Sequence, residues 1–429
     1  MKRIMIAELS SYLNQEVVVS GWIHRLRKLG KIAFIILRDK SGLVQCVIDT
    51  KTIDIKDLKL EAVIKIKGKV KLAQGKSESL EIQVISIDML SPANEDLPIE
   101  INKENMDISL DVMLNNRALS LRNPKLGAVL KVKAVLAQAF SEFLIKNDFT
   151  QIFTPKIVAQ GTEGGSNLFE LNYFETKAYL AQSPQFYKQM MVGAGFERVF
   201  EIGHVYRAES HDTKRHLNEY VSLDVEFGFI QDEYEIMELE NRLLDFMMKE
   251  VESKCSRELE LLGAQLPKVP YQIPKMKLSE AIAILNEKYN LNDLQTDLSP
   301  KGEKLISEYI KREFNSDFVF ITHYPQSKRP MYTMPYGEGE TRSFDLLFRG
   351  LEITTGGQRI HNYNQLLENI VKRGLSKEQF KDYLYIFKYG MPPHGGFAIG
   401  LERITSMLLG FDNVRYASAF PRDKMRLTP

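Results

Sequence analysis

The sequence predicts an α+β protein, in which a small N-terminal β-barrel precedes a larger domain built on an antiparallel sheet. Two observations carry this prediction. Short β-rich runs separated by turns fill about the first 100 of the 429 residues, and the remainder mixes strand runs with helical periodicity. Such a mixture favours an antiparallel α+β domain over a doubly wound sheet. A chain of this length can form two or three domains with substantial cores.

Five β-rich runs predict the barrel. Turn residues lie between them at 39–42 (Asp-Lys-Ser-Gly) and at 74–76 (Gln-Gly-Lys), which suits a five-stranded barrel of the OB-fold type. The stretch 91–98, Ser-Pro-Ala-Asn-Glu-Asp-Leu-Pro, is typical of a linker. We therefore expect a barrel domain over residues 1–100, a hinge over 101–125 and the larger domain over 126–429. The five runs are 17–19, 33–37, 43–48, 62–66 and 80–84.

Start and stop signals mark three helices in the larger domain. Asn123-Pro124 is a good cap and first-turn pair for the first helix. Asp232, with Glu235 three residues later, forms a capping-box-like pair before the second. A last helix is expected from Ile399 to Leu409, ending at Gly410. Strands are expected at 344–348 and 351–354, and no motif is evident between residues 256 and 343.

The charge and cysteine content limit the classes of protein. Because the net charge is +1, any binding of nucleic acid must depend on local basic patches. Cys46 and Cys255 are the only cysteines, which argues against a disulfide framework or a zinc site and fits a reducing compartment. We find neither a signal peptide nor a membrane-spanning run, so we expect a cytoplasmic protein without a membrane partner.

A hairpin around residues 199–227 carries the clearest functional signal. From 220 to 227 polar and apolar residues alternate, which places Tyr220, Ser222, Asp224 and Glu226 on one face of a strand and four apolar side chains on the other. A ring beside two carboxylates, backed by an apolar face, suits the floor of a binding site. The alternative is an ordinary amphipathic hairpin with a solvated loop.

The loop of this hairpin is polar and cationic. Residues 208–218 include His211, Lys214, Arg215 and His216, which suits a polyanion such as a triphosphate. The chain has no glycine-rich loop of the P-loop or dinucleotide-binding kind, which argues against nucleotide binding through those folds.

Three segments in order resemble the three motifs of class II aminoacyl-tRNA synthetases. Residues 149–157, with Pro155, resemble motif 1, residues 197–229, with Arg207-Ala208-Glu209, resemble motif 2, and residues 397–410, with Gly400-Leu401-Glu402-Arg403, resemble motif 3. The resemblance is strongest to aspartyl-tRNA synthetases of the archaeal and eukaryotic type and covers nearly the whole chain. It implies an OB-fold anticodon-binding domain, an antiparallel class II catalytic domain and a homodimer formed through motif 1.

Activation of an amino acid requires positioning and neutralisation of charge on phosphate oxygens rather than a side-chain nucleophile. The resemblance implies two catalytic arginines, Arg207 on the α-phosphate and the attacking carboxylate, and Arg403 on the γ-phosphate. It assigns Tyr220 to the adenine, Glu209 to the adenine or to the accepting end of the tRNA, and His216 to the γ-phosphate, and it counts Leu217 among the ATP-binding residues. Glu352 and Thr355 match magnesium-binding positions, with oxygen ligands that suit this ion. For an isolated arginine the alternative is a surface ion pair.

The resemblance also implies a pocket for aspartate. Lys188 and Arg359 would pair with the substrate β-carboxylate, because a buried cationic pair demands an anion and neutral asparagine would leave charge uncompensated. Asp224 would hold the substrate ammonium, and Glu163 opens a loop, Glu163-Gly164-Gly165-Ser166, that would close over the amino acid. Taken alone, Lys188 is a helix-surface lysine. The other positions implied in this pocket are Ser183, Gln185 and Thr355.

On the barrel, Arg27, Phe34 and Gln45 match residues that read the anticodon. His24 matches a position that is histidine in relatives with relaxed tRNA choice, which favours charging of both tRNA(Asp) and tRNA(Asn); the alternative is a histidine without a role on the barrel surface. A relaxed enzyme would need a partner amidotransferase for the aspartyl-tRNA(Asn). Two other functions stay open: an asparaginyl-tRNA synthetase, against which Lys188 argues, and a non-catalytic RNA-binding paralogue, against which the retained charges argue.

Overall fold

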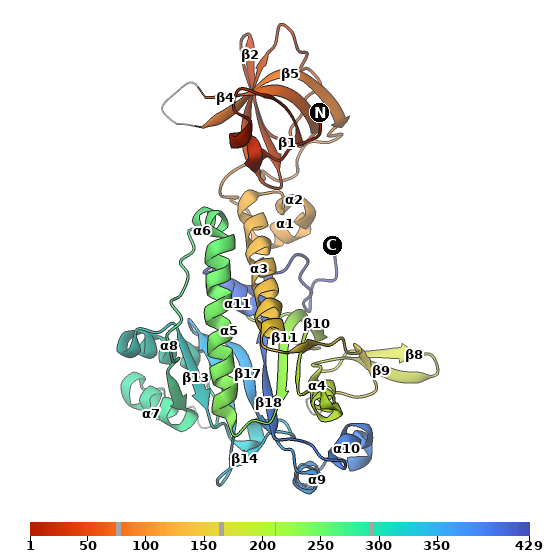
Figure 1. Cartoon of the computed structure of the whole chain (residues 1–429), viewed down its shortest axis with the longest axis vertical. Helices are drawn as coiled ribbons and strands as arrows, with labels where there is room; N and C mark the ends of the chain where they lie inside the picture. The colour runs from red at the N-terminus through yellow and green to blue at the C-terminus, as the bar shows by residue number, and fades with distance from the viewer. Residues whose placement is uncertain (74–78, 163–166, 211, 292–295) are drawn as a thin grey trace. The chain divides into compact units, whose positions relative to one another are not determined.

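The computed structural model describes residues 1–73, 79–162, 167–210, 212–291 and 296–429 (Figure 1). It divides into two compact units, Met1–Asn123 and Pro124–Pro429. Glu163 and His211 lie outside the described residues, as does the turn expected at 74–76. The two units are described separately below.

The first unit is built on a closed barrel, as predicted, and each of the five strands extends beyond the run that predicted it. The strands follow the order β1-β2-β3-β5-β4, and only β3 and β5 pair in parallel. Buried and exposed residues alternate along them, because alternate side chains point into the barrel. The elements are η1 (Ile6–Tyr12), β1 (Glu16–Leu29), β2 (Ile32–Asp39), β3 (Gly42–Asp49), β4 (Val63–Leu72) and β5 (Leu80–Ser91).

Two short helices occupy part of the stretch in which the sequence suggests only a hinge. They are α1 (Leu110–Asn115) and α2 (Arg117–Ser120), and both belong to the first unit. Ser109 caps α1, since its hydroxyl accepts a hydrogen bond from the Val112 amide at 3.3 Å. Helices of four and six residues carry too little periodicity to be recognised in the sequence.

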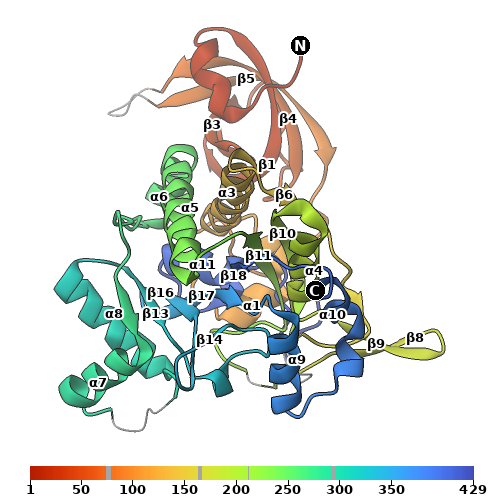
Figure 2. The same cartoon turned by 60° about the horizontal axis from the view of Figure 1, so that its bottom comes forward.

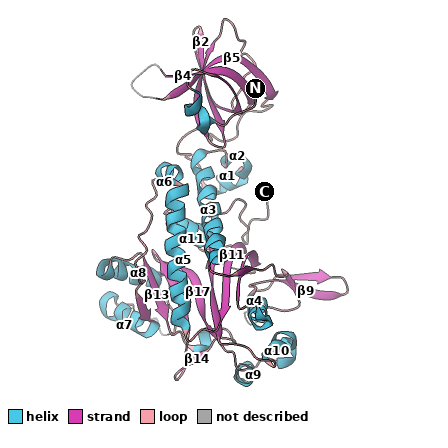
Figure 3. Cartoon of the chain, viewed as in Figure 1, coloured by secondary structure: helices cyan, strands magenta, loops and turns pink. Residues whose placement is uncertain are grey.

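The second unit is centred on an eight-stranded sheet of order β12-β13-β16-β17-β18-β11-β10-β6, shown in magenta in Figure 3. Its inner pairs are antiparallel, and only the outermost pairs, β12–β13 and β6–β10, are parallel. The strands are β6 (Thr150–Gln151), β10 (Arg198–Tyr206), β11 (Glu219–Gly228), β12 (Lys275–Lys277), β13 (Phe318–Thr322), β16 (Ser343–Phe348), β17 (Leu351–Arg359) and β18 (His394–Gly400).

Two long helices cover one face of this sheet. α3 (Pro124–Lys146) and α5 (Glu233–Lys254) lie side by side (Figure 1). Their apolar side chains pack in one core with Leu223, Val225 and Phe227 of β11. The apolar side of β11 is therefore buried beneath the helices. Its polar side, with Tyr220, Ser222, Asp224 and Glu226, belongs to the opposite face of the sheet.

The remaining elements lie around the sheet. They are β7 (Ile157–Val158), β8 (Glu170–Tyr173), β9 (Thr176–Leu180), α4 (Gln185–Met191), η2 (Val192–Phe196), α6 (Ser256–Leu262), α7 (Leu278–Tyr289), α8 (Pro300–Phe314), η3 (Gln326–Lys328), β14 (Pro335–Tyr336), β15 (Glu340–Thr341), α9 (Tyr363–Lys372), η4 (Lys377–Phe380), α10 (Lys381–Phe387), α11 (Leu401–Leu408) and η5 (Val414–Ala417). Residues 256–343, in which the sequence shows no motif, thus supply two strands of the central sheet.

Two details of the expected helices are wrong. Ile399 does not begin the last helix, because it lies in β18, where it pairs with Leu223 and Thr354, and α11 starts only at Leu401. The capping pair before α5 also differs from the prediction. Asp232 accepts from the Tyr234 amide at 2.9 Å, but Glu235 accepts from the Gln231 amide at 2.7 Å rather than from Asp232.

A buried carboxyl group on α5 gives the larger unit a pH-dependent stability. Burial raises the pKa of Glu240 to about 8, against the opposing effect of the Thr354 hydroxyl, so that Glu240 is neutral at pH 7. In the unfolded chain the group loses its proton near its ordinary pKa of 4.5. The folded state should therefore lose stability as the pH rises from about 4.5 to 8.

We predict that Glu240→Gln, which keeps the shape without the acid, removes this loss. Relative to wild type, the variant should gain stability between pH 5 and pH 8, by at most about 5 kcal/mol for a shift of this size. Urea unfolding followed by circular dichroism at both pH values measures the gain, and Glu238→Gln on the exposed side of α5 is the control. Parallel pH profiles for wild type and Glu240→Gln would contradict the prediction.

Candidate active site

A polar cavity of about 270 Å³ lies on the face of the sheet opposite α3 and α5. Its lining brings together all of the residues that the sequence predicts to bind ATP, from the hairpin, from β17 and from α11. The predicted ATP-binding and metal-binding residues in the lining are Arg207, Glu209, His216, Leu217, Tyr220, Glu352, Thr355 and Arg403. Arg215 and the predicted aspartate-binding residue Ser183 line it too.

The β10–β11 hairpin positions Arg207 at one end of the cavity. The Asn218 side chain donates to the carbonyl oxygens of Arg207 and Glu209, at 2.7 and 3.1 Å, and so closes the base of the loop. The Arg207 guanidinium lies over the Tyr220 ring, 5.8 Å from its centroid. Burial raises the pKa of the Tyr220 phenol, which keeps this ring neutral. A cation above a neutral ring is thus fixed at the start of β11.

Arg403 holds the opposite side of the cavity. Its Nη1 donates to the carbonyl oxygen of Glu352 at 3.0 Å and to Glu352 Oε1 at 3.3 Å. Nearby, burial and the adjacent Arg403 charge lower the pKa of His216, so this imidazole is neutral at pH 7. The positive charge of the cavity therefore comes from its arginines, which suits a ligand with several negative charges.

Glu352 and Thr355 lie together, although they are three residues apart on a strand. The Thr355 hydroxyl donates to Glu352 Oε1 at 3.2 Å. A bulge brings them to the same face, because Leu346 and Leu347 of β16 pair with Thr354 and Glu352 and leave one extra residue in β17. Glu352 therefore lies within β17, in the run 351–354 where a strand is expected.

The oxygen atoms around this pair fit a magnesium ion. Glu352 offers a carboxylate and Thr355 a hydroxyl, which are the hard ligands that Mg²⁺ prefers, with phosphates and water completing its shell. Asp345 is the strand partner of Thr355, and its buried Oδ1 accepts no hydrogen bond from the described residues. Burial raises the pKa of Asp345 to about 6. The sequence analysis missed Asp345, which follows an apolar residue in a short strand run and has no motif of its own.

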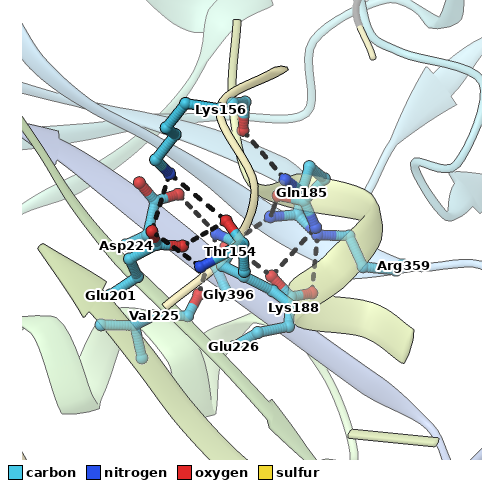
Figure 4. Close-up of polar contacts among 11 residues, drawn as sticks. Thr154, Lys156, Gln185, Lys188, Glu201, Asp224, Val225, Glu226, Arg359 and Gly396 are labelled. Atoms are coloured by element: carbon cyan, nitrogen blue, oxygen red, sulfur yellow. Dashed lines mark hydrogen bonds and ion pairs between the residues drawn. The ribbon is translucent and has the colours of Figure 1, made fainter. Parts of the chain in front are cut away.

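Further along β11, a buried cluster of charges forms the second part of the site (Figure 4). Lys188, on α4, has no exposed surface, and its ammonium lies 2.8 Å from Asp224 Oδ1 and 3.5 Å from Glu226 Oε2. Arg359, at the end of β17, donates from Nε to Glu226 Oε1 at 3.1 Å. Gln185 donates to Glu226 Oε2 at 3.0 Å. Four of the residues predicted to bind aspartate thus meet here.

This cluster corrects the view of Lys188 and Arg359 as an uncompensated cationic pair. The carboxylates of Asp224 and Glu226 balance both cations within the protein. Burial raises the pKa of Glu226, but the charges of Arg359 and Lys188 outweigh it and lower the pKa overall. The alternative in which Lys188 is a helix-surface lysine is excluded, since its side chain is fully buried.

A glycine allows the strands to approach at the cluster. The carbonyl oxygen of Gly396 in β18 accepts from Arg359 Nη2 at 3.0 Å. A side chain at this position would place its Cβ 2.0 Å from the Val225 carbonyl oxygen and 2.5 Å from Glu226 Oε2. A residue without a side chain is therefore needed at position 396, where β18 meets β11 at the cluster.

The cavity and the charged cluster share one strand. Tyr220 and Ser222 line the cavity, whereas Asp224 and Glu226 belong to the cluster, and all four project from the same face of β11. At about 3.3 Å per residue, Tyr220 and Asp224 are roughly 13 Å apart along the strand. This arrangement suits one extended ligand, or two ligands joined end to end.

Two further charged groups were missed in the sequence. Glu201 of β10 is the strand partner of Asp224 and is buried, with Lys156 Nζ 2.7 Å from its Oε1. The hairpin register could have identified it, since directly opposed residues share a face. Glu303 of α8 accepts hydrogen bonds from Arg215 and from the Glu352 amide, the latter at 3.0 Å. Nothing in the sequence around Glu303 indicates this contact.

The barrel residues predicted to contact RNA lie on the outer face of adjacent strands. Arg27 pairs with Phe34 across β1 and β2, and Phe34 pairs with Val47 on β3, two residues from Gln45. Arg27 is exposed, and Phe34 and Gln45 are half-buried. Gln45 donates to Glu81 Oε2 at 3.1 Å. A cation, a ring and an amide thus share one surface of the barrel.

His24 differs from these residues because it is buried, with only 4% of its surface exposed. Its Nδ1 lies 3.1 Å from Arg38 Nη1, and Arg38 forms a buried ion pair with Glu61 at 2.7 Å. Burial and the Arg38 charge lower the pKa of His24 to about 4. The alternative of a histidine on the barrel surface is therefore wrong, and any effect of His24 on RNA must pass through its neighbours.

Comparison with known proteins identifies a family for each part of the chain. Residues 109–424 match the family described as tRNA synthetases class II (D, K and N), and residues 17–90 match the OB-fold nucleic acid binding domain. The chain is 50% identical to the aspartate–tRNA(Asp/Asn) ligase of Thermus thermophilus, with complete coverage of both chains. It is 40% identical to the aspartate–tRNA(Asp) ligase of Pyrococcus horikoshii, with 98% of each chain covered.

Solved structures give the same result for the fold. The crystal structure of asparaginyl-tRNA synthetase from Pyrococcus horikoshii, complexed with asparaginyl-adenylate, superposes with a TM-score of 0.93 and 29% identity over the whole of both chains. Separately, no helix within the described ranges is long and apolar enough to cross a membrane.

Proposed function

The chain belongs to the class II tRNA synthetases (D, K and N), and from this premise we propose that it is an aspartyl-tRNA synthetase. It activates L-aspartate with ATP and transfers the aspartyl group to the 3′-terminal adenosine of tRNA. One observation carries the choice of aspartate: Lys188 and Arg359 meet in a buried cluster beside the arginine-lined cavity.

In this proposal the cavity holds ATP. The adenine stacks on Tyr220, close to Glu209, and Arg207 contacts both the α-phosphate and the attacking carboxylate of the amino acid. Arg403 binds the γ-phosphate. His216 is neutral, so it contributes a hydrogen bond rather than a charge. These groups fix the two reactants in line and stabilise the charge that develops on phosphate oxygens.

Glu352 and Thr355 would hold Mg²⁺, which supplies additional neutralisation of phosphate charge when it is bound. Glu352 is already held in place, since Arg403 donates to its carbonyl oxygen and to its carboxylate. The role of this pair is to orient the triphosphate between Arg403 and Arg207.

The buried cluster discriminates by charge. The β-carboxylate of aspartate pairs with Lys188 and Arg359, and the substrate ammonium pairs with Asp224. The substrate thus adds one charge of each sign, and the cluster stays neutral. Asparagine has the same shape but offers no charge to the two cations. With asparagine the substrate ammonium would still pair with Asp224 and no substrate carboxylate would replace it at Lys188, so a buried cation would be underpaired, which favours aspartate.

We propose that the barrel binds the anticodon through Arg27, Phe34 and Gln45. Phe34→Ala and Gln45→Ala should slow tRNA charging and leave amino-acid activation nearly unchanged, since stacking on one base contributes roughly 1–3 kcal/mol. Ile85→Ala, which removes another apolar side chain from the barrel surface, is the matched control. Equal losses in both half-reactions would count against this role and would indicate a folding defect.

We also propose that both tRNA(Asp) and tRNA(Asn) are charged, as the name of the Thermus thermophilus relative describes for that protein. His24 and its partner Arg38 would act by shaping the barrel surface, and the aspartyl-tRNA(Asn) would then be the substrate of an amidotransferase. Charging the two transcripts side by side tests this proposal. A preference above about 100-fold for tRNA(Asp), equivalent to about 2.7 kcal/mol, would contradict it.

A homodimer through motif 1 completes the proposal. An apolar hollow of about 590 Å³ is lined by Phe153, Pro155, Met191 and neighbouring residues, and Phe153 is 81% exposed in the single chain. Sedimentation equilibrium at micromolar concentration should give twice the mass of the chain, and a monomer would contradict this part.

We place the protein in the cytosol, because both of its cysteines are free thiols.

A further inference from the structure

A closed ring of hydrogen bonds joins Glu303 to three residues that line the cavity, Arg215, Glu352 and Arg403. Glu303 Oε2 accepts from the Arg215 guanidinium and, at 3.0 Å, from the Glu352 amide. The carbonyl oxygen of Glu352 accepts from Arg403 Nη1 at 3.0 Å, and Arg403 Nε donates to the carbonyl oxygen of Arg215 at 3.4 Å. The ring therefore returns to Arg215 after passing through four separate elements.

Glu303 is the only member of the ring that lies outside the three synthetase-like motifs and their magnesium pair. It belongs to α8, which packs beside β13 and β16 (Figure 2), and it is 7% exposed. Ser299 caps this helix, and its hydroxyl accepts from the Gly302 amide at 3.2 Å. The carboxylate of Glu303 is therefore presented from a rigid, capped helix.

The backbone of the hairpin loop does not depend on Glu303. It is held independently, because Arg415 donates to the Thr213 carbonyl oxygen at 3.1 Å and the Val414 amide donates to the Lys214 carbonyl oxygen at 3.0 Å. The Arg215 guanidinium, by contrast, forms its ion pair with Glu303. Removal of the Glu303 charge would thus release the guanidinium without releasing the loop.

We propose that Glu303 is a positioning residue for ATP, which aims the Arg215 guanidinium at the triphosphate and fixes the strand that carries Glu352. The inference rests on the proposed use of ATP. It means that nucleotide binding requires a residue of the segment between motifs 2 and 3. Glu303 touches no substrate itself and acts through Arg215 and the Glu352 backbone.

The test compares Glu303→Gln with wild type and with Glu308→Gln, a substitution at an exposed position of the same helix. Equilibrium dialysis with ATP and Mg²⁺ in the absence of any amino acid measures ATP affinity directly. Glu303→Gln should weaken ATP binding by about 10-fold or more, since it leaves the half-buried Arg215 guanidinium without its charged partner. The KM for aspartate should change by less than about 2-fold, and Glu308→Gln should match wild type.

A second pair of variants separates positioning from a general loss of structure. If Glu303 acts through Arg215, Glu303→Gln should have little further effect on ATP affinity in an Arg215→Gln background. Additive losses, or unchanged ATP affinity in Glu303→Gln, would overturn the inference. If wild type binds ATP and Glu303→Gln weakens it, but no aspartate-dependent activity is found, the inference stands and the proposed choice of amino acid fails.

Discussion

Arg207→Ala should slow aspartate-dependent ATP–pyrophosphate exchange by at least about 100-fold, because the loss of one preorganised charge contact to the transition state costs roughly 3 kcal/mol. Arg207 lines the cavity, and its guanidinium lies over the Tyr220 ring near the start of β11. No other described guanidinium stacks on that ring, so a neighbour cannot replace it. Exchange kinetics at saturating ATP and aspartate measure the loss.

The control is Arg242→Ala, which removes an exposed arginine from α5. It should leave exchange unchanged. A near-normal rate for Arg207→Ala, with the control also normal, would contradict the assignment of Arg207 to the reacting phosphate.

Lys188→Met should slow aspartate activation at least as much as Arg207→Ala does, while the protein still binds ATP. The substitution retains most of the volume but removes a fully buried charge that lies between Asp224 and Glu226. Breaking a buried pair by removing one partner costs roughly 3–5 kcal/mol. The KM for aspartate should rise by more than about 100-fold, whereas ATP affinity should stay within about 3-fold of wild type.

Lys249→Met, on the exposed side of α5, is the matched control. Circular dichroism verifies that both variants are folded. Aspartate activation close to the wild-type rate in Lys188→Met would show that the substrate carboxylate pairs elsewhere. A loss of ATP binding equal to the loss of aspartate binding would show that the cluster supports the fold rather than the pocket.

The floor of the site could be predicted from the sequence because it follows from a local rule. Alternation along residues 220–227 fixes which side chains share a face, and the structure has Tyr220 and Asp224 on that face of β11. The barrel was equally accessible, because short β-rich runs and the turn residues between them are local features of the sequence. In both cases neighbours in the sequence determine the pattern.

Features that depend on distant segments were not accessible. Ile399 reads as helical because its apolar neighbours continue into α11, yet it pairs with Leu223 and Thr354 in the centre of the sheet. The balance of charge around Lys188 depends on β11 and β17, which meet only in the folded chain. Glu303 lies 88 residues from Arg215. A carboxylate in the first turn of a helix is already explained by the helix dipole, so nothing in the sequence marks Glu303 as a partner of Arg215.

This site is expected to activate aspartate, and ATP–pyrophosphate exchange with purified wild-type protein measures that activity. Exchange should be measured in parallel with aspartate, asparagine and each other amino acid, with ATP and Mg²⁺ in excess. The account predicts strong exchange with aspartate and at least about 100-fold lower kcat/KM with asparagine. Preferred exchange with asparagine would make the chain an asparaginyl-tRNA synthetase, and no exchange with any amino acid would support a non-catalytic RNA-binding role; either result would contradict the account.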